Sequence, residues 1–291
     1  MDKRILKKTG IIIGGLLLAG LASNSLAILT SNTYSTDLES SSTQYWSITD
    51  ASQSGLDLTS NDFTISAWIN VESITDNGCG SDAILTIVNK GSGQANKQQY
   101  ILSVCDSAAG GSAWAYQGGH SHNCTNTPNL VQSSNFTGAT ATWFHTVMVA
   151  SSTSPNVGDI AFFTNGALTS FHAAADNSYA CDSDQDFQIG EATASATYDP
   201  FDGLIDDVRV WSRALTEAQI NSLYTDPCNF DDGVNLMGRW LFDNNGNDDN
   251  ATTTPNNLTN NNSATFSTTV AYSCGAAADE VLNTFIQFIG F

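Results

Sequence analysis

Short stretches in which apolar and polar residues alternate are the feature of this sequence that most restricts its fold. The clearest is Phe63–Val71, in which Phe63, Ile65, Ala67, Ile69 and Val71 alternate with Thr64, Ser66, Trp68 and Asn70. A period of two places the first set on one face of a β-strand, whereas a helix requires a period of 3.6 residues. Further strands are expected at Ile84–Val88, Tyr100–Val104, Trp143–Ala150, Ile160–Phe163, Ala167–Phe171, from Phe187, and at Leu204–Trp211. Clusters of glycine, serine and asparagine separate them, so the sequence predicts an all-β sandwich or jelly roll of two antiparallel sheets.

Two local motifs predict a turn and a single helix. Asn165-Gly166 lies between two apolar runs, and both residues tolerate the positive φ of a type I′ turn, which predicts a hairpin. Thr216 with Gln219 three residues later has the pattern of a capping box. An apolar stripe follows at Ile220, Leu223 and Tyr224, and Pro227 ends the segment, so one short helix is expected at the end of the main domain.

The N-terminus has the three parts of a secretory signal peptide. Lys3, Arg4, Lys7 and Lys8 precede a short apolar stretch, Ile11–Leu21, and Ser25-Leu26-Ala27 supplies small residues for cleavage. Residues 1–27 are therefore predicted to be removed. The alternative is an uncleaved membrane anchor, which is disfavoured because Ser23, Asn24 and Ser25 interrupt the apolar run that a spanning helix would need. The mature chain is expected outside the cell or at its surface, with no membrane span.

Six cysteines, all after the leader, indicate a framework of three disulfides, because an even number in an exported chain usually pairs. Six cysteines allow 15 pairings. Order and loop content favour Cys79–Cys105, Cys124–Cys181 and Cys228–Cys274. No two cysteines have the close spacing of a zinc site.

Charge restricts the partners. Nine basic and 29 acidic residues give a net charge of −20, and loss of the leader makes the chain more acidic still. Such a surface argues against nucleic acid or an anionic membrane as a partner and favours cations, notably calcium, although individual aspartates can simply be solvated.

Four segments resemble the laminin-G-like, concanavalin A-like jelly rolls. Phe63–Ile69 is similar to their F-T-I-S-A-W-V strand, Trp143–Val147 to their W-x-H-V strand, and Phe162–Gly166 to their Y-V-N-G hairpin. The run Phe201–Tyr224 is similar almost throughout to their closing strand and helix. The resemblance covers residues 35–226 and implies two sheets of six or seven strands each. It also implies recognition of glycans or proteins, often with calcium.

The segment after Cys228 departs from the usual order. Leu236–Asp243 resembles the strand that normally opens a laminin-G-like unit, yet here it comes last. It is expected either to pack back on the same sandwich or to be the remnant of a second repeat. Four parts are thus predicted: the signal peptide 1–27, the sandwich 28–226, a disulfide-closed β extension 227–275, and an amphipathic tail 276–291.

No catalytic constellation is recognisable. Catalytic jelly rolls of the β-glucanase type carry Glu-x-Asp-x-x-Glu on one strand, and this sequence contains no Glu-x-Asp. His145 lies in an expected core strand and is interpreted as a structural residue. The chain is therefore predicted not to be an enzyme.

Calcium has candidate ligands in two loops and one strand. Asp182, Asp184 and Asp186 alternate on a short loop and could offer clustered oxygens. Asp243–Asp249 forms a second acidic cluster. Asp206 is expected to share a face with Val208 and Val210, where it must hold structural calcium or accept hydrogen bonds from loop amides.

Glycan recognition would require exposed aromatic rings that stack on sugar faces, with polar groups nearby for the hydroxyls. Trp114 and Tyr116 are the favoured pair, because they would point to one face of a glycine-rich stretch. Tyr45-Trp46 is the other candidate, with a core strand as its alternative. The leading hypothesis is a secreted or cell-surface binding or adhesion module that recognises carbohydrate or an extracellular protein. The alternatives are a structural subunit of a matrix or filament and, less favoured, a polysaccharide hydrolase.

Overall fold

The computed structural model describes residues 31–59, 62–74, 79, 84–91, 99–107, 113–120, 129–151, 159–173, 181–193, 199–250 and 254–274. The predicted leader, 1–27, and the predicted tail, 276–291, lie outside these residues. None of the helices within them has the length and apolar character that a membrane span requires.

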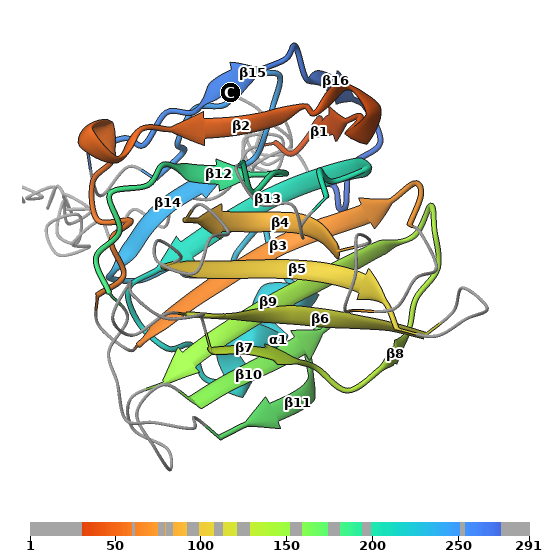
Figure 1. Ribbon diagram of the computed structural model, residues 1–291, viewed down its shortest axis with the longest axis vertical. Helices are drawn as coiled ribbons and strands as arrows, with labels where there is room; N and C mark the ends of the chain where they lie inside the picture. Colours follow the sequence, from red (N-terminus) through yellow and green to blue (C-terminus); the bar gives the residue numbers. More distant parts are fainter. Residues whose placement is uncertain are drawn as a thin grey trace, which may run out of the picture.

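Two eight-stranded antiparallel sheets lie face to face (Figure 1). The first sheet has the order β11 (Ala167–His172), β10 (Asp159–Thr164), β9 (Trp143–Ser151), β3 (Phe63–Val71), β13 (Gly203–Trp211), β1 (Ser35–Leu38) and β16 (Thr265–Ser267), with β14 (Leu236–Trp240) also beside β13. The second has the order β15 (Thr259–Asn261), β2 (Tyr45–Ile48), β12 (Phe187–Ile189), β4 (Ile84–Lys90), β5 (Tyr100–Asp106), β6 (Ala113–His120) and β7 (Asn129–Gln132), with β8 (Phe136–Thr137) beside β6. The predicted all-β jelly-roll sandwich is confirmed.

The main core fills the space between the sheets. Every second residue of β3 points into it, as the period of two predicts: Phe63, Ile65, Ala67, Ile69 and Val71. The opposite face of the first sheet carries a smaller apolar cluster, in which Val147, Val149 and Trp211 pack against the helix α1 (Glu217–Thr225). Short 3-10 helices, Ser40–Ser42 and Asp50–Ser52, follow β1 and β2.

The two predicted local motifs are both present. Asn165 and Gly166 have φ values of 50° and 78°, so the turn between β10 and β11 needs the left-handed conformation at both positions. A side chain at Gly166 would also collide with Tyr224, because its Cβ would lie 3.0 Å from that ring. In α1 the Thr216 side chain accepts from the Gln219 amide and the Gln219 side chain accepts from the Thr216 amide, completing the capping box.

The C-terminal segment returns to the sandwich instead of forming a separate unit. β14 pairs with the second half of β13, while β1 pairs with the first half on the same side. β16 then pairs with β1, and β15 extends the second sheet beside β2. Of the two possibilities for this segment, packing back on the same sandwich is the one observed.

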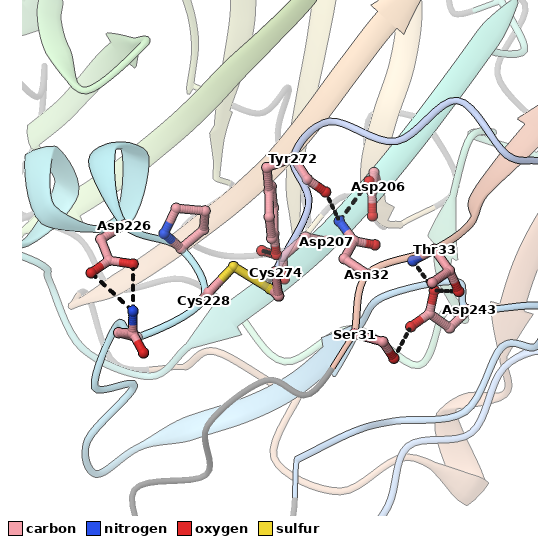
Figure 2. Close-up of a disulfide and its surroundings, with 12 residues drawn as sticks. Ser31, Asn32, Thr33, Asp206, Asp207, Asp226, Cys228, Asp243, Tyr272 and Cys274 are labelled. Atoms are coloured by element: carbon pink, nitrogen blue, oxygen red, sulfur yellow. Dashed lines mark hydrogen bonds between the residues drawn. A yellow bond between two sulfur atoms is a disulfide. The ribbon is translucent and has the colours of Figure 1, made fainter. Parts of the chain in front are cut away.

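Disulfide bonds link segments that are distant in the sequence. Cys79–Cys105 and Cys228–Cys274 are formed, as predicted. Cys181 is disulfide-bonded too, and its predicted partner, Cys124, lies outside the described residues. The Cys228–Cys274 bond joins the end of α1 to the segment after β16 (Figure 2).

Candidate functional site

The predicted aromatic platform is wrong. Trp114 and Tyr116 are fully buried in the main core, where Tyr116 stacks on Phe136, so neither ring can meet a sugar. The glycine-rich stretch beside them continues the strand β6. A Cβ on Gly118 would lie 2.7 Å from Met148 Sδ, so this glycine makes room for core packing. The other candidate pair, Tyr45 and Trp46, lies in the strand β2, which was its predicted alternative: Trp46 is buried and Tyr45 is half-buried.

The predicted calcium loop is held by an internal lysine. Lys90 is completely buried, and its Nζ lies 2.6 Å from Asp50 Oδ1 and 2.9 Å from Asp57 Oδ1. It also donates to the carbonyl oxygens of Ser183 and Gln185, at 3.1 and 2.8 Å. The buried ammonium group of Lys90 therefore binds two backbone oxygens of this loop. Asp182, Asp184 and Asp186 are not brought within ligand distance of one another in the described structure.

Asp206 lies on the other face of β13 from the one predicted. Across to β3, Asp206 pairs with Trp68 and Arg209 pairs with Ser66, so two residues of β13 oppose the single residue Ala67. This bulge, in which Asp207 has φ of 42°, leaves Val208 in the main core and turns Asp206 and Asp207 to the outer face of the sheet. The sequence pattern could not show it, because one extra residue reverses the faces beyond it.

Loop amides, one of the two predicted partners, bind Asp206. Its Oδ2 accepts from Asn32 Nδ2 at 3.0 Å (Figure 2). It also accepts from the Ala271 amide, at 3.0 Å. Burial raises the pKa of this carboxyl to about 8, despite these hydrogen bonds. Asp206 therefore anchors the C-terminal segment to the sheet.

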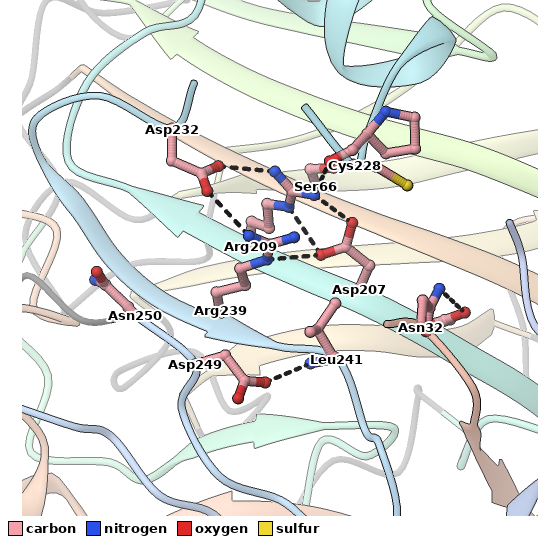
Figure 3. A network of polar contacts seen from close by, with 12 residues as sticks. Asn32, Ser66, Asp207, Arg209, Cys228, Asp232, Arg239, Leu241, Asp249 and Asn250 are labelled. Carbon is pink, nitrogen blue, oxygen red and sulfur yellow. Dashed lines mark hydrogen bonds and ion pairs between the residues drawn. The ribbon is translucent and has the colours of Figure 1, made fainter. Parts of the chain in front are cut away.

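Asp207 is the centre of a buried ion network (Figure 3). Arg209 Nη2 lies 2.6 Å from Asp207 Oδ2, and Arg239 Nε lies 3.4 Å from Oδ1. Asp232 contacts both guanidinium groups from the other side. Burial alone would raise the pKa of Asp207, but the two guanidinium groups outweigh it and hold the pKa well below its usual value. The network is structural, because Asp207, Arg209 and Arg239 are buried and bound to one another.

His145 is also structural, as predicted. It is fully buried, its Nε2 shares a hydrogen bond of 2.9 Å with Ser66 Oγ, and burial lowers the pKa of its ring to about 3. The second acidic cluster, Asp243–Asp249, also binds backbone amides. Asp243 accepts hydrogen bonds from the amides of Thr33 and Tyr34, and Asp248 accepts from three other backbone amides.

One group of carboxylates that the sequence did not suggest does converge. Asp37 on β1, Glu39 after it and Glu72 after β3 bring one oxygen each within 4.8 Å of the others, the only such trio among the described residues. Burial and then the charge of Asp202 raise the pKa of Asp37. Burial and then Asp37, Glu39 and Asp202 raise that of Glu72. A sequence reading would miss the trio because β1 and β3 lie on opposite sides of β13.

An open groove of about 500 Å³ runs beside α1, and we call it the α1 groove. Its lining comes from the exposed side of the helix and from the loop that follows, and consists of Ala218, Gln219, Ser222, Thr225, Asp226, Asn229, Phe230 and Asp231. The half-buried ring of Phe230 is fixed from below, because it meets Trp211 edge-on and the Arg209 guanidinium lies 5.9 Å from its centre.

The polar side chains of the α1 groove are held in place. Both carboxylate oxygens of Asp226 accept from Asn229 Nδ2, at 2.9 and 3.2 Å, and Asp231 Oδ1 accepts from the Gly233 amide at 3.0 Å. Figure 2 shows Asp226 at the end of α1, near the Cys228–Cys274 disulfide. One aromatic ring among carboxylate, amide and hydroxyl groups is a composition suited to sugars, since rings cover C–H faces and polar groups bind hydroxyls. Sequence reasoning missed this groove. Its signal was Phe230 in the polar loop directly after the predicted helix.

The chain is similar to a known protein family and to several solved structures. A laminin G family model, described as the concanavalin A-like lectin/glucanases superfamily, matches residues 40–221. No curated protein shows significant similarity to the chain. A structure from Bacteroides ovatus, of a protein to which carbohydrate binding is ascribed, is 20% identical, with a TM-score of 0.56 over 84% of this chain.

The chain spans 62% of the length of the Bacteroides protein. A heptameric pentraxin of Limulus polyphemus is 14% identical, with a TM-score of 0.48 over 68% of this chain and 82% of its own. The CBM40 domain of a Ruminococcus gnavus sialidase is 11% identical, with a TM-score of 0.48 over 67% of this chain and 98% of its own. At such identities the Bacteroides structure supports the fold alone. The family match covers more than half of the sequence, and the chain therefore belongs to the concanavalin A-like lectin/glucanases superfamily.

Proposed function

We propose that this chain is an extracellular carbohydrate-binding module without catalytic activity, and that it holds its glycan in the α1 groove. The observation that carries the proposal is the composition of that groove on a lectin-like sandwich: one fixed aromatic ring surrounded by anchored carboxylate, amide and hydroxyl groups. Family membership and the binding function ascribed to the Bacteroides protein support it.

An extracellular location fits the cysteine chemistry. Disulfides persist in oxidising compartments, and Cys79–Cys105 and Cys228–Cys274 are both formed. The predicted signal peptide supplies the export route. Adhesion to a surface would follow if the recognised glycan is itself attached to a cell or matrix.

The non-catalytic part of the proposal rests on the sequence. Catalytic jelly rolls of the β-glucanase type carry the carboxylates that flank the bond in a Glu-x-Asp-x-x-Glu motif on one strand, and no Glu-x-Asp pair exists in the chain. Incubation with a panel of polysaccharides should release no reducing sugar. Release of reducing sugar would make the chain a hydrolase.

A steric variant tests the glycan site directly. Ala218 is exposed, lines the α1 groove and makes no side-chain hydrogen bond, so Ala218→Trp should fill the groove without disturbing the core. Asn221→Trp introduces the same side chain at an exposed position of α1 that does not line the groove. On a glycan array, Ala218→Trp should lose at least tenfold in affinity and Asn221→Trp should bind like the parent. Equal binding by both variants would place the glycan elsewhere.

We further propose that calcium binds to the trio Asp37, Glu39 and Glu72. A divalent cation would offset the mutual repulsion that contributes to the raised pKa of Glu72. Millimolar calcium should then raise the melting temperature of the parent, and Glu72→Gln should abolish most of that rise. A melting temperature that does not respond to calcium or to a chelator would remove the ion from the proposal.

A further inference from the structure

We infer that the α1 groove selects saccharides that carry no acidic group, that is, neutral sugars or amino sugars. The inference rests on the glycan-binding function proposed above and names its class of ligand. It follows from the charges that line the groove and from the way nearby cations are already engaged.

Two carboxylates and no cation line the groove. Asp226 and Asp231 stand on the loop side, and the remaining lining side chains are uncharged. The hydrogen bonds that fix these carboxylates come from one amide side chain and one backbone amide. A carboxylate has about four acceptor sites, so each keeps capacity for a sugar hydroxyl or ammonium group. An acidic sugar would meet like charge at both positions.

The two arginines closest to the groove are committed to the protein. Arg213 donates to the carbonyl oxygens of Val234 and Asp232, both at 3.0 Å, and more weakly to Gln219 Oε1 at 3.4 Å. Arg209 lies beneath Phe230, completely buried, and is paired with Asp207 and Asp232. Strong recognition of a sugar carboxylate or sulfate uses a guanidinium fork, whereas Arg209 is buried in ion pairs and each nitrogen of the Arg213 guanidinium already donates within the protein. The net charge of −20 adds a long-range repulsion of acidic ligands.

The test compares oligosaccharides that share a backbone and differ in charge: oligomers of glucose, of glucosamine and of glucuronic acid, measured by calorimetry at low and high salt. We expect the neutral and amino oligomers to bind at least tenfold more tightly than the acidic one. At low salt the amino oligomer should bind more tightly than the neutral one, because its ammonium groups meet the two carboxylates. This preference should shrink in high salt, because salt screens charge.

A pair of double variants separates the groove from the overall charge. Asp226→Asn with Asp231→Asn keeps the acceptors for Asn229 and Gly233 and should reduce the discrimination against the acidic oligomer at least tenfold. Asp182→Asn with Asp184→Asn removes the same amount of charge from an exposed loop elsewhere and should leave the discrimination intact. Equal effects of the two pairs would mean that net charge alone decides, which would overturn the inference.

Other outcomes distinguish the inference from the function on which it rests. Tight binding of the acidic oligomer overturns the inference and leaves a carbohydrate-binding protein. Binding that survives Ala218→Trp also overturns it, because the glycan would then lie outside the groove. Failure of every saccharide on a broad array to bind would instead remove the proposed function itself.

Discussion

At the scale of single residues, Asp206 makes stability depend on pH. In the unfolded chain its carboxyl should ionise near the ordinary value of 3.8, whereas burial raises the folded pKa to about 8. Between these values folding takes up a proton, so the free energy of unfolding falls as pH rises. A shift of this size corresponds to at most about 6 kcal/mol, since one pKa unit is about 1.4 kcal/mol. Asp206→Asn, whose amide is neutral at every pH, should remove this dependence. Urea unfolding at pH 5 and pH 8 measures it.

Asp207→Asn is the matched control, because the neighbouring residue is buried to the same degree with the opposite pKa shift. Removing its charge leaves Arg209 and Arg239 with Asp232 as their one carboxylate partner, and should cost about 3–5 kcal/mol at neutral pH. If Asp206→Asn were equally destabilising at pH 6, Asp206 would be ionised in the folded protein at that pH, and a folded pKa of about 8 would be contradicted.

Lys90 supports a second prediction at this scale. Lys90→Met keeps the length of the side chain but leaves Asp50 and Asp57 without their cation and the carbonyl oxygens of Ser183 and Gln185 without a donor. Removing one partner of a buried ion pair costs roughly 3–5 kcal/mol, so denaturant unfolding should show a loss of that order. Glycan affinity should not change, because Lys90 does not line the α1 groove. A loss below about 1 kcal/mol would show that the lysine does not hold this loop.

At the scale of elements, the capping box of α1 links stability to the groove. Thr216→Ala removes the side chain that accepts from the Gln219 amide, which should cost about 1 kcal/mol. Gln219 lines the groove, so a frayed first turn should also weaken glycan binding. Asn221→Ala, at an exposed position of the same helix that does not line the groove, serves as the control. Thermal unfolding and glycan titration of the two variants check both parts. A Thr216→Ala protein as stable as Asn221→Ala would contradict the role of the cap.

Elements whose signal is local could be predicted from the sequence, and those that depend on distant partners could not. The alternation in β3, the Asn165-Gly166 turn and the Thr216–Gln219 box are each written within a few residues, and the structure has all three. The face of Asp206 depends on a bulge opposite β3, and the loop at Asp182–Asp186 depends on a lysine more than 90 residues away. The face shared by Trp114 and Tyr116 was predicted to be exposed, but the glycines beside them mark close packing in the core, where Gly118 meets Met148. The groove arises only when α1 and the loop after it are packed on the sheet.

At the scale of the whole molecule, the segment after Cys228 completes the sandwich. Trp240 and Phe242 are buried in the main core, where Trp240 stacks on Phe187 of the second sheet and Phe242 packs against Trp46. Asp206 binds the amide of Ala271, and Asp207 binds the hydroxyl of Tyr272, so the end of the segment is tied to β13 as well. The family model ends at residue 221. The fold of this chain therefore depends on residues beyond the part that identifies its family.

A truncated chain tests this dependence. Loss of Trp240 and Phe242 alone should cost roughly 6–10 kcal/mol, since each buried aromatic side chain is worth about 3–5 kcal/mol. That is as large as the whole stability of a typical domain, about 5–15 kcal/mol. Residues 28–226 should thus show no cooperative thermal transition and little near-ultraviolet circular dichroism, whereas residues 28–274 should show both. The control matters because it removes the tail but keeps β14–β16 and the Cys228–Cys274 disulfide. A cooperative transition in the shorter chain, within about 2 kcal/mol of the longer one, would mean that the sandwich is complete at Asp226 and that the returning strands only cover it.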